Sequence, residues 1–354
     1  MDERIRRLRE WSTGNPKGPY KVQLNPTNRC NLNCISCTAR GRARYVPGEE
    51  VSIRRYLGLI GEAAALGAVY CDICGGGEPL RRPGIMGIIK EIKKHRMVGS
   101  LISNGTLLTE SRIRDMIMTE WDFVNLSLDG PTPGINDPLR GKGTFAKVAT
   151  ALEIFQSLKK GLGAKKPDVC VYSVLSSKNY QHIPGMIDLA RRLGLEGLYF
   201  QPVTASDKSY GLDITDARAY NKMLTEGRKL LAETGIKTNI ELIEDIPGQP
   251  GSMQDDERPK TADVPLKMPC YSPWLTAVIR ADGTCGPCPP GVEFVQGCNI
   301  KNQSLKEVWF GRVFSEFREK LKAGTRMECC GNCGSMERIA NRDTGLSAEA
   351  EHYE

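Results

Sequence analysis

Three cysteines near the start of the chain have the spacing needed for iron–sulfur chemistry. Cys30, Cys34 and Cys37 form a C-x3-C-x2-C motif within the string NRCNLNCISC. Cysteine thiolates normally supply all four ligands of a [4Fe–4S] cube, so three thiolates would leave one iron open to a small chelating molecule. The alternatives are a zinc knuckle or three buried cysteines. Zinc sites usually pair two C-x2-C hooks, and the nearest further cysteine is Cys71.

A glycine-rich segment with one carboxylate follows about 40 residues later. Gly75, Gly76, Gly77 and Glu78 come directly after the apolar stretch 69–74, which we expect to be a strand. Glycines let the backbone approach a ligand closely. The Glu78 carboxylate could accept hydrogen bonds from an ammonium group.

The cysteine motif and the Gly76-Gly77-Glu78 segment together resemble the radical S-adenosylmethionine (SAM) superfamily. In that family the open iron binds the amine and carboxylate of SAM, and an electron from the cluster releases a 5′-deoxyadenosyl radical. The resemblance implies α/β architecture, a partial (βα)6 TIM-like barrel, with SAM at the C-terminal ends of the strands. It places Gly76, Gly77 and Glu78 at the methionine amine. It also implies a reductant such as ferredoxin or flavodoxin.

Short polar side chains end the next two expected strands. By the resemblance, the SAM pocket or the path of the radical is lined by Ser103, Asn104, Ser127 and Asp129. Capping of the following helices is the alternative for each of them. Arg140 begins Arg-Gly-Lys-Gly-Thr-Phe, which resembles the family's R-G-x-G-[ST]-F stretch. The implied role of Arg140 is to pair with the methionine carboxylate or to order the loop.

The chain departs from the family just before that stretch. The family often has His-Asp there, whereas this chain has Asn136-Asp137. The change removes a titratable imidazole, so no proton-transfer role is assigned to this position. No catalytic residue is identified from the sequence.

Seven of the thirteen cysteines lie between positions 270 and 333, in a segment rich in Gly and Pro. The pattern C-x(9–15)-G-x4-C is met by Cys270, Gly283 and Cys288, and the pair Cys330-x2-Cys333 follows. These motifs resemble the SPASM and twitch extensions of the superfamily. The resemblance implies one auxiliary [4Fe–4S] cluster, which assists electron transfer and is held by Cys270, Cys288, Cys330 and Cys333.

Three further cysteines of this segment are left without a role. A full SPASM domain would continue with cysteines where this chain has Ile339 and Asp343. A complete second auxiliary cluster therefore lacks ligands. Cys285, Cys298 and Cys329 could be spare thiols, ligands of an unusual second cluster, or replacements for neighbouring ligands.

Alternating β-like and α-like segments from about 20 to 205 indicate a parallel α/β fold. Strands are expected over 20–26, 69–74, 99–103, 123–128, 168–175 and 196–202, and helices over 52–66, 83–95, 109–119, 143–159 and 180–193. Cys71, Cys74 and Cys170 lie on expected strands and are predicted to be core residues.

The motifs divide the chain into five expected parts. These are an N-terminal helix within 1–19, the barrel at 20–205, a helical segment and Pro-rich linker or lid at 206–268, a SPASM/twitch-like auxiliary domain at 269–335, and a polar tail at 336–354. Residues 1–12 are expected to form that helix, with one face packed on the barrel.

The net charge and the distribution of basic and apolar residues limit the kinds of partner that we expect. The formal charge is +7 with cysteines neutral, and two thiolate-bound clusters would reduce it to roughly +4. This balance mildly favours an anionic substrate. Basic residues are scattered without aromatic interleaving, so no nucleic-acid partner is expected. The absence of a long apolar run or a signal core predicts a cytoplasmic protein without a transmembrane segment.

We therefore expect a radical SAM enzyme that abstracts a hydrogen atom from a small or anionic metabolite. One alternative is a maturase of a peptide or protein substrate, because relatives in this superfamily modify peptides as well as sugars, lipids and porphyrins. The other is a non-catalytic iron–sulfur electron carrier, although a carrier has no need of a SAM pocket. The substrate and the outcome of the reaction do not follow from the sequence.

Overall fold

The fold is described from a computed structural model. It covers residues 2–37, 46, 48–203, 212–243, 245–246, 270–325 and 327–330. Residues 247–268 of the Pro-rich linker expected at 245–268, the tail at 336–354 and the predicted ligand Cys333 lie outside these described residues.

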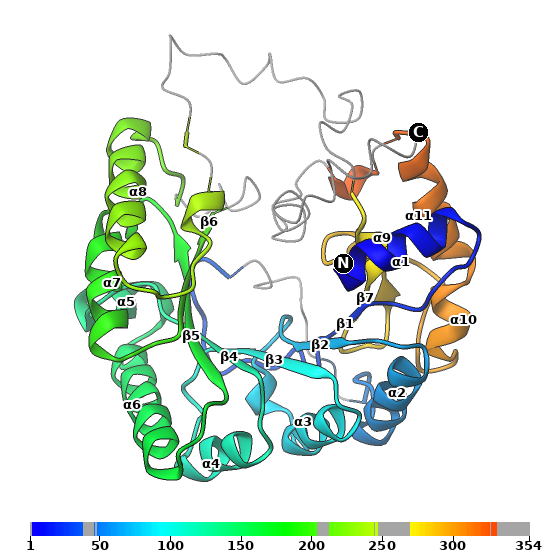
Figure 1. The fold of residues 1–354 in the computed structure, drawn as a ribbon, viewed down its shortest axis with the longest axis horizontal. Coiled ribbons are helices and arrows are strands. Elements are labelled where there is room, and N and C mark those ends of the chain that lie inside the picture. Colours follow the sequence, from blue (N-terminus) through cyan, green and yellow to red (C-terminus); the bar gives the residue numbers. More distant parts are fainter. Residues whose placement is uncertain are drawn as a thin grey trace.

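All six expected strands are present and form one parallel sheet that curves as an open arc (Figure 1). They are β1 (Lys21–Leu24), β2 (Tyr70–Ile73), β3 (Val98–Ser103), β4 (Phe123–Ser127), β5 (Asp168–Leu175) and β6 (Gly197–Pro202). Neighbours in the sheet are neighbours in sequence from β1 to β6. Their carboxyl ends, and the loops that follow them, therefore share one rim of the barrel.

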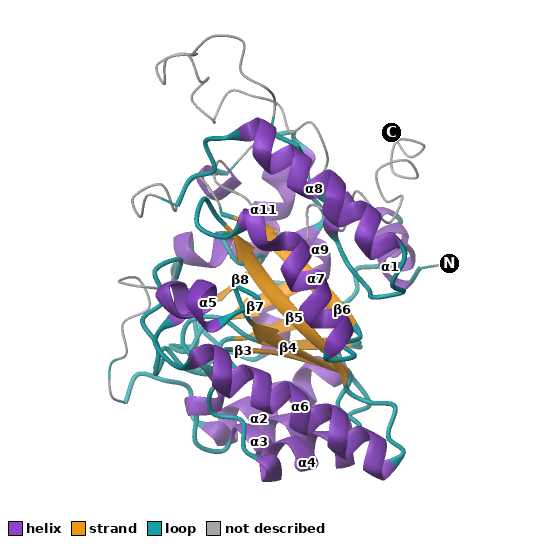
Figure 2. Ribbon diagram, turned by 90° about the vertical axis from the view of Figure 1, so that its left-hand side faces the viewer, coloured by secondary structure: helices purple, strands orange, loops and turns teal. Residues whose placement is uncertain are grey.

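Five expected helices cover the outer face of this arc (Figures 1 and 2). They are α2 (Ile53–Ala65), α3 (Ile85–Lys94), α4 (Glu110–Met118), α6 (Thr144–Leu162) and α7 (Ile183–Arg192). Their apolar stripes pack on outward strand residues such as Leu24, Ile73 and Leu126, which are fully buried. Helix α8 (Ala217–Ala232) packs against α7, and the expected N-terminal helix is α1 (Glu3–Ser12).

One helix of the barrel is absent from the sequence-based prediction. Helix α5 (Pro133–Arg140) contains Pro138 and starts with Pro133. Proline is compatible with the first helical turn but disfavoured inside a helix, so this stretch resembles a loop. Its side chains prove to organise the rim, as described below.

The C-terminal segment continues the barrel sheet instead of standing apart from it. It contains α9 (Ser272–Leu275), β7 (Thr276–Ile279), β8 (Cys285–Gly286), α10 (Leu305–Trp309) and α11 (Arg312–Lys322). Strand β7 pairs in parallel with β1, with Lys21 opposite Thr276, and β8 pairs antiparallel with β7. The structure is thus mixed α/β, a partial barrel of six strands extended by a small C-terminal unit.

The inner face of the barrel is more exposed than the outer face. On β1 and β2 the inward residues Lys21, Gln23, Tyr70 and Asp72 are half-buried, while the outward residues between them are buried. This alternation indicates that the inner face is polar and only partly buried at these two strands. Within the described residues, no helix is both long and apolar enough to cross a membrane.

Candidate functional site

The three cysteines of the first motif lie together on the loop that follows β1. Cys30 is exposed, and Cys34 and Cys37 are half-buried. Burial raises the pKa of Cys30 and of Cys34, and the neighbouring Cys37 thiolate raises both further. The three thiols are therefore near enough to influence one another's ionisation, as ligands of one cluster would be.

The glycine-rich segment lies directly against this loop. Gly77 donates its N–H to the carbonyl of Thr27 at 2.8 Å, and Glu78 donates its N–H to the carbonyl of Arg29 at 2.8 Å. A Cβ on Gly77 would lie 2.2 Å from the Arg29 carbonyl oxygen. Gly77 is thus required for the close approach of two backbone segments, one of which carries Cys30.

Glu50 fixes the start of the same loop, a role that the sequence analysis missed. Its carboxylate accepts hydrogen bonds from the Thr27 hydroxyl at 2.6 Å and the Asn28 N–H at 2.9 Å. Arg82 pairs with the other oxygen at 2.5 Å. The Glu50 side chain is 6% exposed. No local sequence signal marks this residue, because its partners come from two other loops.

Polar groups approach two of the sulfur atoms, donors at Cys30 and a carbonyl oxygen at Cys34. The N–H of Leu32 points at Cys30 Sγ at 3.4 Å, and Asn104 Nδ2 lies 3.9 Å from the same sulfur. On the other side of the loop, Cys34 Sγ lies 3.6 Å from the Arg140 carbonyl oxygen, and Ile35 donates its N–H to Leu139. The loop is therefore held from both β3 and α5.

Glu78 is buried at the centre of the rim, where it accepts three hydrogen bonds. Its donors are the Ser103 hydroxyl at 2.7 Å, the Asn104 N–H at 2.7 Å and the Leu80 N–H at 3.0 Å. Burial raises the pKa of Glu78, while these donors favour the carboxylate. Two predicted pocket residues, Ser103 and Asn104, thus meet the predicted ammonium acceptor.

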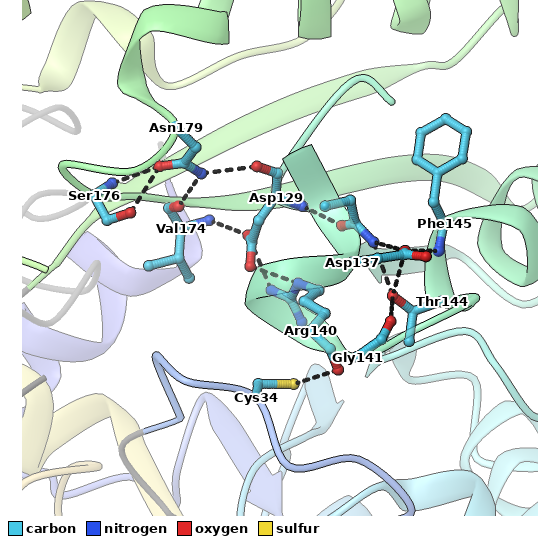
Figure 3. Close-up of polar contacts among 11 residues, drawn as sticks. Cys34, Asp129, Asp137, Arg140, Gly141, Thr144, Phe145, Val174, Ser176 and Asn179 are labelled. Carbon is cyan, nitrogen blue, oxygen red and sulfur yellow. Dashed lines mark hydrogen bonds and ion pairs between the residues drawn. The ribbon is translucent and has the colours of Figure 1, made fainter. Parts of the chain in front are cut away.

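Asp129 and Arg140 form a buried ion pair (Figure 3). Arg140 Nε lies 2.6 Å from one carboxylate oxygen of Asp129, and Nη2 donates to the other oxygen at 3.1 Å. The Val174 N–H donates to the same carboxylate at 2.8 Å. The structure therefore brings together two predicted pocket residues and ties them to β5. Their contact with SAM stays a prediction.

Asn136 and Asp137 have structural partners in this network (Figure 3). Asn136 is fully buried, accepts the Asp129 N–H at 2.9 Å and donates to the Thr144 hydroxyl at 2.8 Å. Asp137 accepts the N–H groups of Gly143 at 2.6 Å and Phe145 at 2.9 Å. Burial opposes the Asp137 charge, but these donors hold its pKa below the usual value. Both residues therefore position the start of α6.

The barrel interior beneath this rim carries charges and phenols that the sequence analysis did not single out. Lys21 Nζ lies 3.5 Å from an Asp72 carboxylate oxygen. Burial, and the Asp72 charge after it, raises the pKa of Tyr70. The rings of Tyr172 and Tyr199 stack with centroids 5.0 Å apart. The alternation of polar residues on β1 and β2 was the available signal. Ser127, another predicted pocket residue, is half-buried at the end of β4.

Three of the four predicted auxiliary ligands lie in segments that the fold connects. The Ser272 hydroxyl, two residues after Cys270, donates to the Pro287 carbonyl at 3.0 Å, next to Cys288. The Gly291 N–H donates to Cys288 Sγ at 3.1 Å. The short 3₁₀ helix η6 (Gly291–Phe294) packs against η7 (Glu328–Cys330), which carries the third.

The unassigned cysteines are buried. Cys285 and Cys298 share a side-chain hydrogen bond, and both belong to the apolar core. Cys329 is buried as well. Cys71, Cys74 and Cys170 are buried, as predicted for core residues. A second cluster built on Cys285 and Cys298 would have to displace this core packing.

The donor chemistry fits iron–sulfur cubes better than a single metal ion. The candidate ligands are cysteines, two of them with N–H groups directed at sulfur. Across the described part of the chain, no three His, Cys, Asp or Glu side chains are arranged to hold one metal ion. A cube is ligated at four separate irons, so its thiolates need not converge on one point. The zinc-knuckle alternative therefore finds no support.

Comparison with protein families agrees with this site. The radical SAM superfamily matches residues 24–164, and the SPASM family, an iron–sulfur cluster-binding domain, matches residues 270–334. The chain therefore contains a radical SAM domain and a C-terminal SPASM domain. It is an enzyme whose cofactors are SAM, a SAM-binding [4Fe–4S] cluster and auxiliary iron–sulfur.

Curated relatives match nearly the whole chain. Mycofactocin maturase MftC of Mycobacterium tuberculosis is 25% identical over 95% of this chain and 81% of its own. The AdoMet-dependent heme synthase of Methanosarcina barkeri is 24% identical over 90% and 88%. The PqqA peptide cyclase of Ruegeria pomeroyi is 26% identical over 85% and 76%.

Solved structures share the fold at lower identity. Streptococcus suis SuiB bound to S-adenosylmethionine superposes with a TM-score of 0.66 at 15% identity, covering 88% of this chain and 71% of that one. Native anSMEcpe with bound AdoMet gives a TM-score of 0.63 at 20% identity, covering 91% and 88%.

Proposed function

We propose that this enzyme modifies a peptide or protein substrate. The observation that carries the proposal is the similarity to a maturase over 95% of this chain and to a peptide cyclase over 85% of it. A heme synthase of similar identity keeps a small-molecule substrate as the second candidate. The sequence analysis favoured a small or anionic metabolite, and the similarities support its peptide alternative better.

The proposed site lies at the rim of the barrel, above its interior. Cys30, Cys34 and Cys37 hold the first cluster, and Cys270, Cys288, Cys330 and Cys333 hold the auxiliary cluster. When bound, the first cluster supplies the electron that splits SAM to the 5′-deoxyadenosyl radical, which abstracts a hydrogen atom from the substrate.

Residues of the chain would bind SAM at this site and hold the rim in place. The buried carboxylate of Glu78 would accept a hydrogen bond from the SAM ammonium, since its three donors leave acceptor capacity on its oxygens. The Asp129–Arg140 pair would hold the rim between the cluster loop and β5. Gly76, Gly77, Ser103, Asn104 and Ser127 complete the proposed SAM pocket.

The half-buried inner face of the barrel is the proposed contact surface for a substrate side chain. It combines tyrosine rings with the Lys21–Asp72 pair, the mixture of apolar surface and few polar groups that binding sites use. A side chain reaching this interior from the rim would pass the SAM site. The peptide backbone would then remain at the rim.

The test uses an extract of the producing organism, divided by size and then treated or not treated with protease. Each fraction is incubated anaerobically with holoenzyme, SAM and dithionite, and stimulated formation of 5′-deoxyadenosine is measured. A peptide substrate predicts that stimulation disappears after protease treatment. Stimulation that resides in a small-molecule fraction and resists protease would favour the metabolite candidate and contradict the proposal.

A further inference from the structure

A buried arginine on α11 is held between two tryptophan rings. Arg318 is 5% exposed, and its guanidinium lies 4.4 Å from the ring centroid of Trp11 and 4.5 Å from that of Trp309. Its Nε donates to the Pro273 carbonyl and its Nη1 to the Trp309 carbonyl, both at 2.9 Å. These contacts fix the cation of α11 between α1, α9 and α10.

No carboxylate among the described residues neutralises this charge. Arg318 makes no ion pair there, and its Nη2 is buried without a hydrogen-bond partner. Burial alone lowers the pKa of Arg318 to about 9. An isolated buried charge is costly unless an anion compensates it. The two tryptophan faces offset only part of that cost.

One segment with a predicted auxiliary ligand contacts this arginine, and a second contacts the neighbouring residue Phe317. Pro273, whose carbonyl binds Arg318, is three residues from Cys270. The preceding residue on α11, Phe317, has its Cε1 atom 3.3 Å from where a Cβ on Gly291 would lie. The Gly291 N–H in turn donates to Cys288 Sγ. Consecutive residues of α11 thus contact the Cys270 and Cys288 segments.

We propose that Arg318 is the counter-charge of the auxiliary cluster and raises its reduction potential. A [4Fe–4S]²⁺ core with four thiolates carries about two negative charges, and one-electron reduction adds another. A fixed cation stabilises the reduced form more than the oxidised form, because the attraction grows with the added charge. The potential of such clusters depends on the surrounding charge and burial. Arg318 is a tuning residue in this view and does not touch substrate.

This inference rests on the auxiliary cluster and on Cys270 and Cys288 as its ligands, and is independent of the substrate. Holoenzyme is titrated anaerobically with dithionite and followed by electron paramagnetic resonance. The first cluster's signal is identified by its loss when Cys30, Cys34 and Cys37 are changed to Ala. The variants are Arg318→Met and Arg318→Gln, which remove the charge, and Arg318→Lys, which keeps it. Arg312→Met is the control, because Arg312 lies on the same helix and its side chain is 82% exposed.

The neutral variants should lower the reduced-to-oxidised ratio of the auxiliary cluster about tenfold at a fixed potential, a shift of about 59 mV for one electron. Arg318→Lys and Arg312→Met should stay near wild type. If neither neutral variant retains the auxiliary cluster while Arg318→Lys does, the charge requirement is supported. An unchanged potential in a neutral variant would overturn the proposal. Loss of the auxiliary cluster in Arg318→Lys would also overturn the proposal. So would a shift of its potential in Arg318→Lys equal to that of the neutral variants, since either result would assign Arg318 a packing role.

Discussion

The carboxylate of Glu78 is enclosed by donors from the end of β3 and from its own turn, and among the described residues it makes no direct ion pair, although the Arg112 charge favours its ionised form. Burial therefore works against its charge and raises its pKa. An arriving ammonium group would relieve that cost. Glu78 thus holds the rim together, and its role as acceptor for the SAM amine is a prediction that can be tested at this single residue.

Glu78→Gln should weaken SAM binding about tenfold, close to 1.4 kcal/mol, because a hydrogen bond to a charged group is lost. Equilibrium dialysis of anaerobic holoenzyme with SAM measures the affinity, and iron analysis verifies that both clusters remain. Glu110→Gln is the matched control, since Glu110 is 62% exposed on α4. Wild-type affinity in a fully loaded Glu78→Gln protein would exclude Glu78 as the amine acceptor.

Three segments around the site hold the loop that carries Cys30, Cys34 and Cys37. The turn after β2 pairs with one side of the loop, and α5 binds the other side through Leu139 and Arg140. Glu50 closes the start of the loop from a third segment. Because none of residues 25–37 belongs to the apolar core, we infer that these hydrogen bonds determine where the thiols of the loop lie.

Gly77→Ala tests whether this loop must be held closely by the turn after β2. The added methyl would fall 2.2 Å from the Arg29 carbonyl oxygen, and such overpacking typically costs about 1–3 kcal/mol. We expect the first cluster to be lost after reconstitution, leaving about four irons of about eight. Gly87→Ala is the control, because an added Cβ there meets nothing within 4 Å on helix α3. A Gly77→Ala protein with full iron content would show that the close approach is dispensable.

At the scale of helices and strands, local sequence patterns predict most of the fold but not the contacts between distant segments. The six strands and five barrel helices follow from apolar periodicity and turn residues, which are local signals. Helix α5 was missed because Pro133 and Pro138 are typical of loops. The pairing of β7 with β1 was missed because it joins segments more than 250 residues apart. Glu50 and Asp72 were missed for the same reason, since their partners are distant in sequence.

At the scale of the whole molecule, the SPASM domain is built onto the barrel through the β1–β7 pairing. Further contacts join them, since Arg55 on α2 donates to the carbonyls of Ile300 at 2.7 Å and Gln303 at 3.1 Å. The Trp309 indole N–H donates to the Lys17 carbonyl at 2.8 Å. A continuous sheet thus joins β7 and β8 of the SPASM domain directly to the barrel.

Replacing both Cys330 and Cys333 with Ala should remove the auxiliary cluster and abolish product, yet leave some 5′-deoxyadenosine formation. The reason is that SAM cleavage is assigned to the separate N-terminal cluster. Liquid chromatography with mass spectrometry measures both products. Loss of the cluster can also unfold this segment, because metal can organise such segments. The measurement is therefore made on a soluble variant that still binds SAM. Wild-type product yield would show that these two cysteines have no role in turnover.

The central claim is that Cys30, Cys34 and Cys37 hold the cluster that splits SAM. The most direct measurement is 5′-deoxyadenosine and methionine formation by anaerobically reconstituted, dithionite-reduced protein, alongside the variant in which all three cysteines are Ala. Wild type should contain about eight irons and release both products, whereas the variant should keep about four irons and release neither. Formation of S-adenosylhomocysteine alone, or an unchanged iron content and cleavage rate in the triple variant, would contradict the assignment.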